Sequence, residues 1–145
     1  MKIMAIDYGD AHTGVAVSDA LETLAGFTTV IHTHRPEAVA AEIAQLAIQH
    51  SAAELVLGHP LNMDGSRGPR AEKAEAFAAL LRETTGLPVT LWDERRTTID
   101  AHNILMAGGK NARPRKKTVD AVAASLMLEG YLSLRARRRA AENPL

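Results

Sequence analysis

The chain of 145 residues contains no cysteine, which excludes disulfide frameworks, thiolate zinc sites and thiol nucleophiles. Aromatic residues are scarce, with two Tyr, two Phe and one Trp, so a platform of several stacking side chains is not expected. Net charge is also absent, because 17 basic residues balance 17 acidic ones, and this excludes a uniformly basic surface for nucleic acid. Lys2 and Asp7 place charges in the opening residues, which therefore resemble neither a signal peptide nor a membrane span. We expect a cytoplasmic protein without a membrane partner.

What is present is the composition of a globular domain, with 46% hydrophobic and 23% charged residues. No linker or repeat divides the chain, so we predict one domain over residues 1–134, followed by a basic C-terminal tail over residues 135–145. The balanced total conceals a local excess, because residues 110–139 hold nine basic side chains against two acidic ones. We interpret the part before the last predicted helix as a phosphate-contacting loop, and the part after it as either a solvated tail or an extension of that basic surface. The basic residues are Lys110, Arg113, Arg115, Lys116, Lys117, Arg135, Arg137, Arg138 and Arg139.

Short apolar or β-branched runs predict five strands, at residues 2–7, 14–18, 27–33, 55–58 and 89–92. Segments with apolar residues at helical spacing predict helices at residues 36–50, 70–85 and 118–134, with a short helix between 97 and 106. The first three strands predict an antiparallel meander, and the fourth, entered from a helix, is predicted to run parallel to the first. The fold class is therefore α/β, with a five-stranded mixed sheet flanked by helices. A ribonuclease H-like architecture fits this order, and a flavodoxin-like sheet is the alternative.

Carboxylates stand where the apolar strands end. Asp7 closes the first strand, and Asp93 and Glu94 follow the fifth. Asp120 lies in the predicted first turn of the last helix. Taken singly, each has a structural explanation, since a carboxylate can pair with a cation or stabilise a helix N-terminus. If the first, fourth and fifth strands are adjacent and parallel, however, their carboxyl ends meet at one edge, where open α/β sheets bind ligands.

Three oxygen ligands at such an edge, without histidine or cysteine, are typical of a Mg²⁺ or Mn²⁺ site. Five of the six histidines show no metal-ligand spacing with one another, which argues against zinc. Two such ions about 3.5 to 4 Å apart can activate water and stabilise the leaving oxygen in an in-line displacement at phosphorus. The basic segment before Asp120 would hold a polyanion against the carboxylates. These residues favour phosphodiester hydrolysis.

Four segments, in order along the chain, resemble motifs of the YqgF/RuvX family of Holliday junction resolvase-like proteins, also described as pre-16S rRNA nucleases. They are residues 7–19 (DYG followed by GVAVSD), 58–65 (GHPLNMDG), 93–98 (DERRTT) and 116–124 (KKTVDAVAA). The resemblance covers residues 1–134 and implies a ribonuclease H-like fold, divalent-metal nuclease chemistry, a cytoplasmic location and maturation of the 5′ end of 16S rRNA. It also implies that Asp7, Glu94 and Asp120 are the catalytic metal ligands.

Other residues are candidates for contact with nucleic acid, namely Asn62, Arg95, Arg113, Arg115, Lys116 and Lys117. Asn62 can orient a phosphate, although the neighbouring residues 64–65 (Asp-Gly) also predict an ordinary turn. Arg95 can clamp a phosphate or pair with Asp93, and the sequence favours neither. Arg67 and Arg70 are candidates to extend the basic rim, although Arg70, close to a helix start, is rather interpreted as solvated.

The chain departs from the family between Gly9 and Gly14. The family commonly carries basic residues there, whereas this chain has residues 10–13 (DAHT), in which His12 is the one potential cation. Asp10 is interpreted as a turn former, with a role as an extra metal ligand as the alternative.

The main hypothesis is a metal-dependent nuclease that processes pre-rRNA as a monomer or homodimer. A junction-resolving DNA endonuclease would use the same site and would need a dimer, so that two strands meet two sites. A contact with the ribose 2′-hydroxyl would distinguish RNA from DNA, and the sequence identifies no residue for this contact. A nucleic-acid-binding module without catalysis is a third reading, and an actin-like or sugar-kinase-like ATPase, which requires two such domains, is a fourth.

Overall fold

The computed structural model describes residues 1–22, 25–96 and 116–142, leaving aside the side chains of residues 116–120. Within these ranges the chain forms one five-stranded sheet with the strand order β3-β2-β1-β4-β5. The predicted α/β fold class is confirmed, and each predicted strand is present to within a few residues at its ends. The strands are β1 (Lys2–Tyr8), β2 (Thr13–Ser18), β3 (Ala25–Ile31), β4 (Ala52–His59) and β5 (Val89–Asp93).

The strand pairing brings three carboxyl ends to one edge of the sheet. β2 pairs antiparallel with both β1 and β3, which confirms the predicted meander. β1 and β4 are parallel, with Ile6 opposite Leu57. β4 and β5 are parallel as well, with Gly58 opposite Trp92. The expected adjacency of the first, fourth and fifth strands is therefore confirmed.

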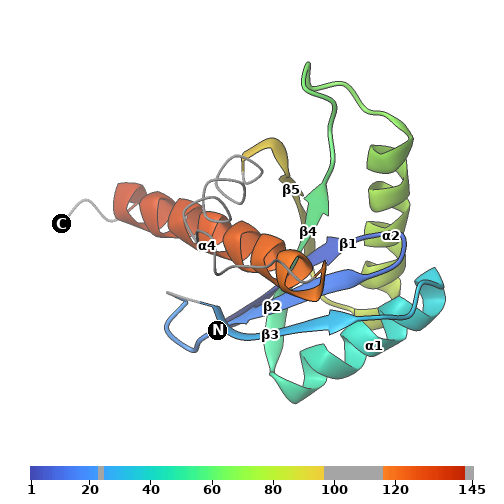
Figure 1. Cartoon of the computed structure of the whole chain (residues 1–145). Helices are drawn as coiled ribbons and strands as arrows, with labels where there is room; N and C mark the ends of the chain where they lie inside the picture. Colours follow the sequence, from blue (N-terminus) through green and yellow to red (C-terminus); the bar gives the residue numbers. More distant parts are fainter. Residues whose placement is uncertain (23–24, 97–115, 143–145) are drawn as a thin grey trace, which may run out of the picture.

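Helices cover both faces of the sheet. α1 (Pro36–Gln49) and α2 (Pro69–Thr85) pack on one face, and α4 (Lys116–Glu142) crosses the other (Figure 1). Proline at the first position starts α1 and α2, because its fixed φ suits a helix and its missing N–H is not needed there. α2 ends at Gly86, whose φ of 70° lies in the left-handed region that glycine adopts without strain.

Two hydrophobic clusters lie on opposite faces of the sheet, because side chains alternate along each strand. Ile6 belongs to one cluster together with Phe77 of α2. Ala5 belongs to the other together with Leu128 of α4. Trp92 is in this second cluster and is 6% exposed, which confirms the interpretation that it is a core residue. The two clusters hold the helices against the sheet and leave its carboxyl edge for polar groups.

The last helix is longer than the sequence predicts. Expected over residues 118–134, it begins at Lys116 and ends at Glu142, because these flanking residues are good helix formers with no helix breaker among them. Lys116 and Lys117 are therefore helical rather than part of a loop, and Asp120 lies in the second turn rather than the first. Residues 135–142 of the predicted tail continue the helix, so residue 134 does not mark a helix end. The short helix expected between 97 and 106 lies outside the described residues.

Ion pairs fix the C-terminal half of α4 to the sheet. Arg135 pairs with Glu54 of β4 and with Glu22 of the turn after β2, at 3.3 and 3.4 Å. Arg139 also pairs with Glu22, at 3.1 Å. The Tyr131 hydroxyl donates a hydrogen bond to Glu54. These arginines neutralise carboxylates that are only 12% and 15% exposed, so they serve to attach the helix. No helix in the described ranges is long and apolar enough to cross a membrane.

The contribution of α4 packing is testable at Leu128, whose side chain is fully buried against the sheet. We expect Leu128→Ala to lower the free energy of unfolding by about 2–5 kcal/mol, since the lost contacts and the remaining cavity both destabilise the fold. Leu21→Ala is the matched control, because Leu21 is 80% exposed and its truncation should change stability by less than about 0.5 kcal/mol. Urea unfolding followed by circular dichroism measures both values, and equal effects would contradict the described packing.

Candidate active site

Asp7 lies at the carboxyl end of β1, on the face of the sheet that α4 covers. Ile3 and Ala5 belong to the cluster beneath α4, and because side chains alternate along a strand, Asp7 continues their row. Its side chain is partly buried. A carboxylate in this place has no packing value, so its presence calls for a polar or charged partner.

Glu94 reaches Asp7 by passing over β4. It follows β5, and since neighbouring strands lie about 4.8 Å apart, roughly two strand spacings separate it from β1. Gly58 of β4 lies between them, and a Cβ atom added there would overlap Oε1 of Glu94. The backbone N–H of Glu94 donates to the carbonyl of His59, at 3.2 Å, which holds the turn after β5. The glycine therefore provides the space in which the Glu94 side chain lies.

The two carboxyl groups influence each other strongly. Burial and the negative charge of Asp7 raise the pKa of Glu94 to about 7, and a hydrogen bond between the two groups acts in the same direction. The positive charge of Arg70 opposes this and lowers the pKa of Glu94. Two negative charges are thus unfavourable here without a proton or a cation to compensate them.

This donor set has the chemistry that a hard divalent cation requires. Asp7 and Glu94 offer carboxylate oxygens in a partly buried position, and Gly58 leaves space above β4. Among the described side chains, no group of three or more His, Cys, Asp or Glu is placed to hold a metal ion. Asp7 and Glu94 are two of the three predicted metal ligands, and the side chain of the third, Asp120, is not among those described.

The third predicted ligand, Asp120, is on α4, the helix that covers the Asp7 face of the sheet (Figure 1). Its side chain is outside the described part of the structure, as are those of Lys116 and Lys117. Arg113 and Arg115 lie entirely outside it. The structure thus brings together two of the three predicted metal ligands, and the contacts of these four basic residues stay predictions.

A narrow cleft of ≈ 30 Å³ opens beside Glu94. Arg70 and Lys73 of α2 line it opposite the end of β1, and Nζ of Lys73 donates to Oδ1 of Asp10 at 2.7 Å. Asp10 is therefore ion-paired in the structure, and a role as an extra metal ligand stays a prediction. Arg70 is exposed, as expected, but it also borders the site. Lys73 was not among the predicted site residues, although its spacing of i, i+3 from Arg70 on one helix was the available signal. The cleft is lined by Tyr8, Gly9, Asp10, Pro60, Arg70, Lys73, Ala74 and Glu94.

Asn62 lies in the loop between β4 and α2, which projects beyond the sheet (Figure 1). The loop is closed by its own polar groups: Nδ2 of Asn62 donates to Oγ of Ser66 at 2.9 Å, and Oδ1 of Asp64 accepts from the Ser66 N–H. Gly65 donates to the carbonyl of Asn62 with a φ of 88°. These bonds are those of a turn, so the turn interpretation is confirmed, and binding of nucleic acid by Asn62 stays a prediction.

Arg95 pairs with Asp93, one of the two interpretations that the sequence left open. Its Nε and Nη2 donate to the Asp93 carboxylate at 3.0 and 2.6 Å, and its Nη1 donates to the carbonyl of Met63 at 3.2 Å. The guanidinium lowers the pKa of Asp93. Arg95 therefore connects the turn after β5 to the loop after β4, and a contact with phosphate stays a prediction.

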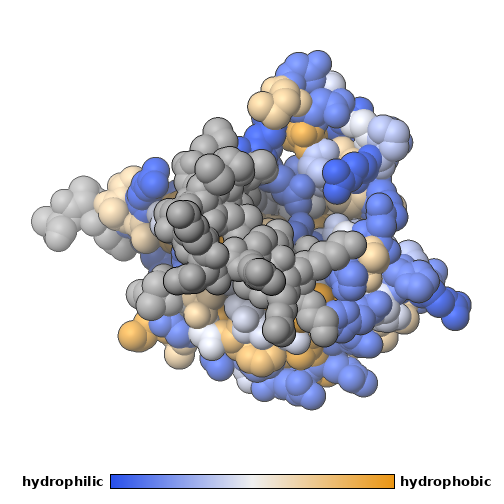
Figure 2. Space-filling model, in the orientation of Figure 1, coloured by the Kyte–Doolittle hydropathy of each residue, from blue (hydrophilic) through white to orange (hydrophobic). Residues whose placement is uncertain are grey.

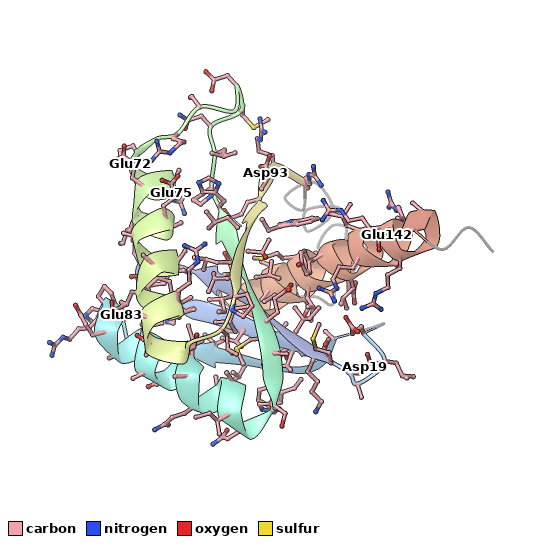
Figure 3. All side chains as sticks on the ribbon, turned by 180° about the vertical axis from the view of Figure 1, so that it is seen from behind. Asp19, Glu72, Glu75, Glu83, Asp93 and Glu142 are labelled. Carbon is pink, nitrogen blue, oxygen red and sulfur yellow. The ribbon has the colours of Figure 1, made fainter. Side chains whose placement is uncertain are left out.

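A second set of ion pairs attaches that loop to α2. Glu75 accepts from Arg67 and from Nε2 of His59, the latter at 2.8 Å, and these partners lower the pKa of Glu75 to about 2. Glu75 and Asp93 lie at the same end of the molecule, and Glu83 marks the opposite end of α2 (Figure 3). In the space-filling view, hydrophilic residues predominate around the loop between β4 and α2 and along α2 (Figure 2). Arg67, like Arg95, is engaged by a carboxylate of the protein.

Known proteins of similar structure share the whole architecture. The RuvC resolvase of Thermus thermophilus, solved with a Holliday junction substrate, has a TM-score of 0.64 at 16% identity, over 94% of this chain and 96% of that one. The Fowlpox virus resolvase has a TM-score of 0.52 at 12% identity, over 96% and 98%. At these identities the likeness concerns the fold alone. The fold and the carboxylate pair define this protein as a ribonuclease H-like α/β domain.

Sequence comparisons identify the family. The family model described as "RuvX: Holliday junction resolvase" matches residues 1–134, and the chain belongs to this family. A protein of Halothermothrix orenii named "Putative pre-16S rRNA nuclease" is 42% identical over 133 residues, which is 92% of this chain and 95% of that protein. One of Myxococcus xanthus with the same name is 44% identical over 133 residues, covering 91% and 87%. The resemblance noted in the sequence is confirmed.

The coupling between the two carboxyl groups gives a testable prediction for the metal-free protein. Asp7→Asn removes a negative charge beside Glu94, so we expect the pKa of Glu94 to fall from about 7 toward its ordinary value of 4.5. Asp19→Asn is the control, because Asp19 lies at the opposite edge of the sheet and should leave this pKa unchanged. Carboxyl ¹³C NMR titration measures the value, and an unaltered Glu94 pKa in Asp7→Asn would contradict the described pair.

Proposed function

We propose that this protein is a divalent-metal-dependent nuclease that hydrolyses phosphodiester bonds in the maturation of the 5′ end of pre-16S rRNA. The observation that carries the proposal is the meeting of Asp7 and Glu94 at the carboxyl edge of the sheet, in a chain 42% identical to a relative named for this activity. Open α/β sheets bind their ligands at this edge. We assign the catalytic metal ligands to Asp7, Glu94 and Asp120, and the metal to Mg²⁺ or Mn²⁺.

The divalent ions, when bound, supply an activated water and stabilise the leaving oxygen in an in-line displacement at phosphorus. The residues of the chain prepare this chemistry. Asp7 and Glu94 have to be ionised to act as ligands, and the same repulsion that raises the pKa of Glu94 makes the pair attract cations. Asp93 is ion-paired with Arg95, whereas Glu94, the next residue, interacts with Asp7.

The substrate is a nucleic acid in this proposal, with pre-rRNA as the first choice. The family description favours a second candidate, because it names Holliday junction resolvases. Resolution of a junction requires two sites in a twofold dimer, whereas trimming of an rRNA end requires one site. The oligomeric state and the response to branched DNA therefore separate the two candidates.

We expect Glu94→Gln to lower metal-dependent cleavage by more than about 100-fold, since the amide keeps the shape but loses the charge that holds a cation. Glu83→Gln is the matched control, because Glu83 lies at the opposite end of α2 (Figure 3) and should leave cleavage unchanged. Activity is measured on a pre-16S 5′ precursor RNA, single-stranded DNA and a four-way DNA junction, each with Mg²⁺, Mn²⁺ or EDTA.

Each outcome of this assay has a distinct meaning. Cleavage of the precursor RNA that needs metal and Glu94 supports the proposal, and paired symmetric cuts confined to the junction would support the resolvase instead. Cleavage that persists in EDTA or in Glu94→Gln would contradict the assigned site. Binding without cleavage under any metal would leave a nucleic-acid-binding module.

The space above β4 gives a separate test of the site. Gly58→Ala places a methyl group where Oε1 of Glu94 lies, so we expect loss of cleavage comparable to that of Glu94→Gln. Gly26→Ala is the control, because a Cβ atom there would make ordinary contacts of 3.6 Å with Asp19. Circular dichroism establishes that both variants fold. A folded Gly58→Ala variant with normal activity would show that Glu94 does not need its described position.

A further inference from the structure

The carboxyl edge of the sheet needs cations to hold a polyanion, and among the described side chains most of the cations near it are already engaged. Arg95 is bound by Asp93 and Arg67 by Glu75. Arg135 and Arg139, farther away, neutralise poorly exposed carboxylates. These pairs keep the loop and α4 in place, so releasing any of the four arginines to a ligand would uncouple structural elements.

Arg70 and Lys73 differ from these arginines in their surroundings. Both lie on α2 and line the cleft that also holds Glu94. Lys73 is 51% exposed, and its partner Asp10 is 87% exposed. An ion pair between two exposed groups contributes little to stability, because water screens it. Asp10 can therefore leave Lys73 without disturbing the fold.

The floor beneath Lys73 is rigid. The Tyr8 ring stacks on Phe77 with ring centroids 3.9 Å apart and planes within 5°, and Phe77 is 3% exposed. Nζ of Lys73 lies 5.7 Å from the Tyr8 ring centroid, within the range of a cation–π contact. The Tyr8 ring is thus a second contact of Lys73, besides Asp10.

From these positions we infer that Arg70 and Lys73 form a binding subsite for a backbone phosphate of the nucleic acid, beside the Asp7–Glu94 pair, and that Asp10 competes with this phosphate for Lys73. The Asp10 carboxylate accepts the hydrogen bond of Lys73 that a phosphate oxygen would accept. In this inference the Lys73–Asp10 pair dissociates when nucleic acid binds. The inference rests on the nucleic-acid substrate of the proposed function. It does not require cleavage.

The experiment measures binding without catalysis. Fluorescence anisotropy of a fluorescein-labelled single-stranded RNA is recorded with the full-length protein in EDTA, over a series of KCl concentrations. We expect Lys73→Gln and Arg70→Gln each to weaken binding about five- to tenfold and to reduce the slope of log K against log[salt] by about 0.7. Lys2→Gln removes the same charge at the opposite end of β1 and is expected to change neither quantity.

Asp10→Asn gives the sharper result, because the inference predicts a gain. Removal of the competing carboxylate should tighten RNA binding about two- to fivefold. The gain should disappear when Asp10→Asn is combined with Lys73→Gln, since Lys73, the cation that Asp10 binds, is then absent. Glu83→Gln makes the same change in net charge on exposed α2 surface and should leave binding unchanged.

The inference is overturned if Asp10→Asn binds RNA no more tightly than the wild type, if its gain persists without Lys73, or if the wild type does not bind the oligonucleotide. It is also overturned if Lys73→Gln and Arg70→Gln bind like Lys2→Gln. Failure of the proposed function looks different: the binding changes would follow the expected pattern while the wild type cleaved no substrate with either metal. If the wild type showed metal-dependent cleavage while these variants bound RNA unchanged, the subsite would be contradicted and the proposed function would be retained.

Discussion

Repulsion between two partly buried carboxylates is the constraint on which this site depends. Asp7 ends β1 and Glu94 follows β5, yet the fold places them together and thereby raises the pKa of Glu94. Such an arrangement costs stability in the absence of a proton or cation, and proteins keep such a cost mainly where the charge has a function. The same repulsion that disfavours the pair makes it a strong attractor of hard cations, which is the property that a metal-dependent nuclease of this family would use.

The surrounding structure serves to hold that pair. β4 separates β1 from β5, and Gly58 lets the Glu94 side chain cross it. Arg95 binds Asp93 and the carbonyl of Met63, so that the turn after β5 and the loop after β4 hold each other. α4 covers the Asp7 face, and its ion pairs to the opposite part of the sheet fix its position along that face.

The ion-paired cations in the described part of the chain divide into two groups by the exposure of their partners. The arginines bound to poorly exposed carboxylates are structural, whereas the Lys73–Asp10 pair is exposed on both sides. Among the described residues, Arg67, Arg95 and Arg135 are each paired with a carboxylate of the protein. A chain without an overall positive surface can still present positive charge next to its carboxylate site.

The five strands, the α/β fold and the two strand-end carboxylates could be predicted from the sequence, because apolar periodicity and the cost of burying a charge are local properties of the residues. The resemblance to the family could also be recognised from the sequence, in motifs such as residues 58–65. The sequence did not decide which cation meets which carboxylate. Arg95 had two equal interpretations, Arg70 was interpreted as solvated and Lys73 was not predicted. α4 extended beyond both predicted ends. These points follow from the three-dimensional arrangement, because ion pairs between residues distant in sequence, such as Lys73 with Asp10 or Arg135 with Glu54, depend on the strand order and helix placement that bring them together.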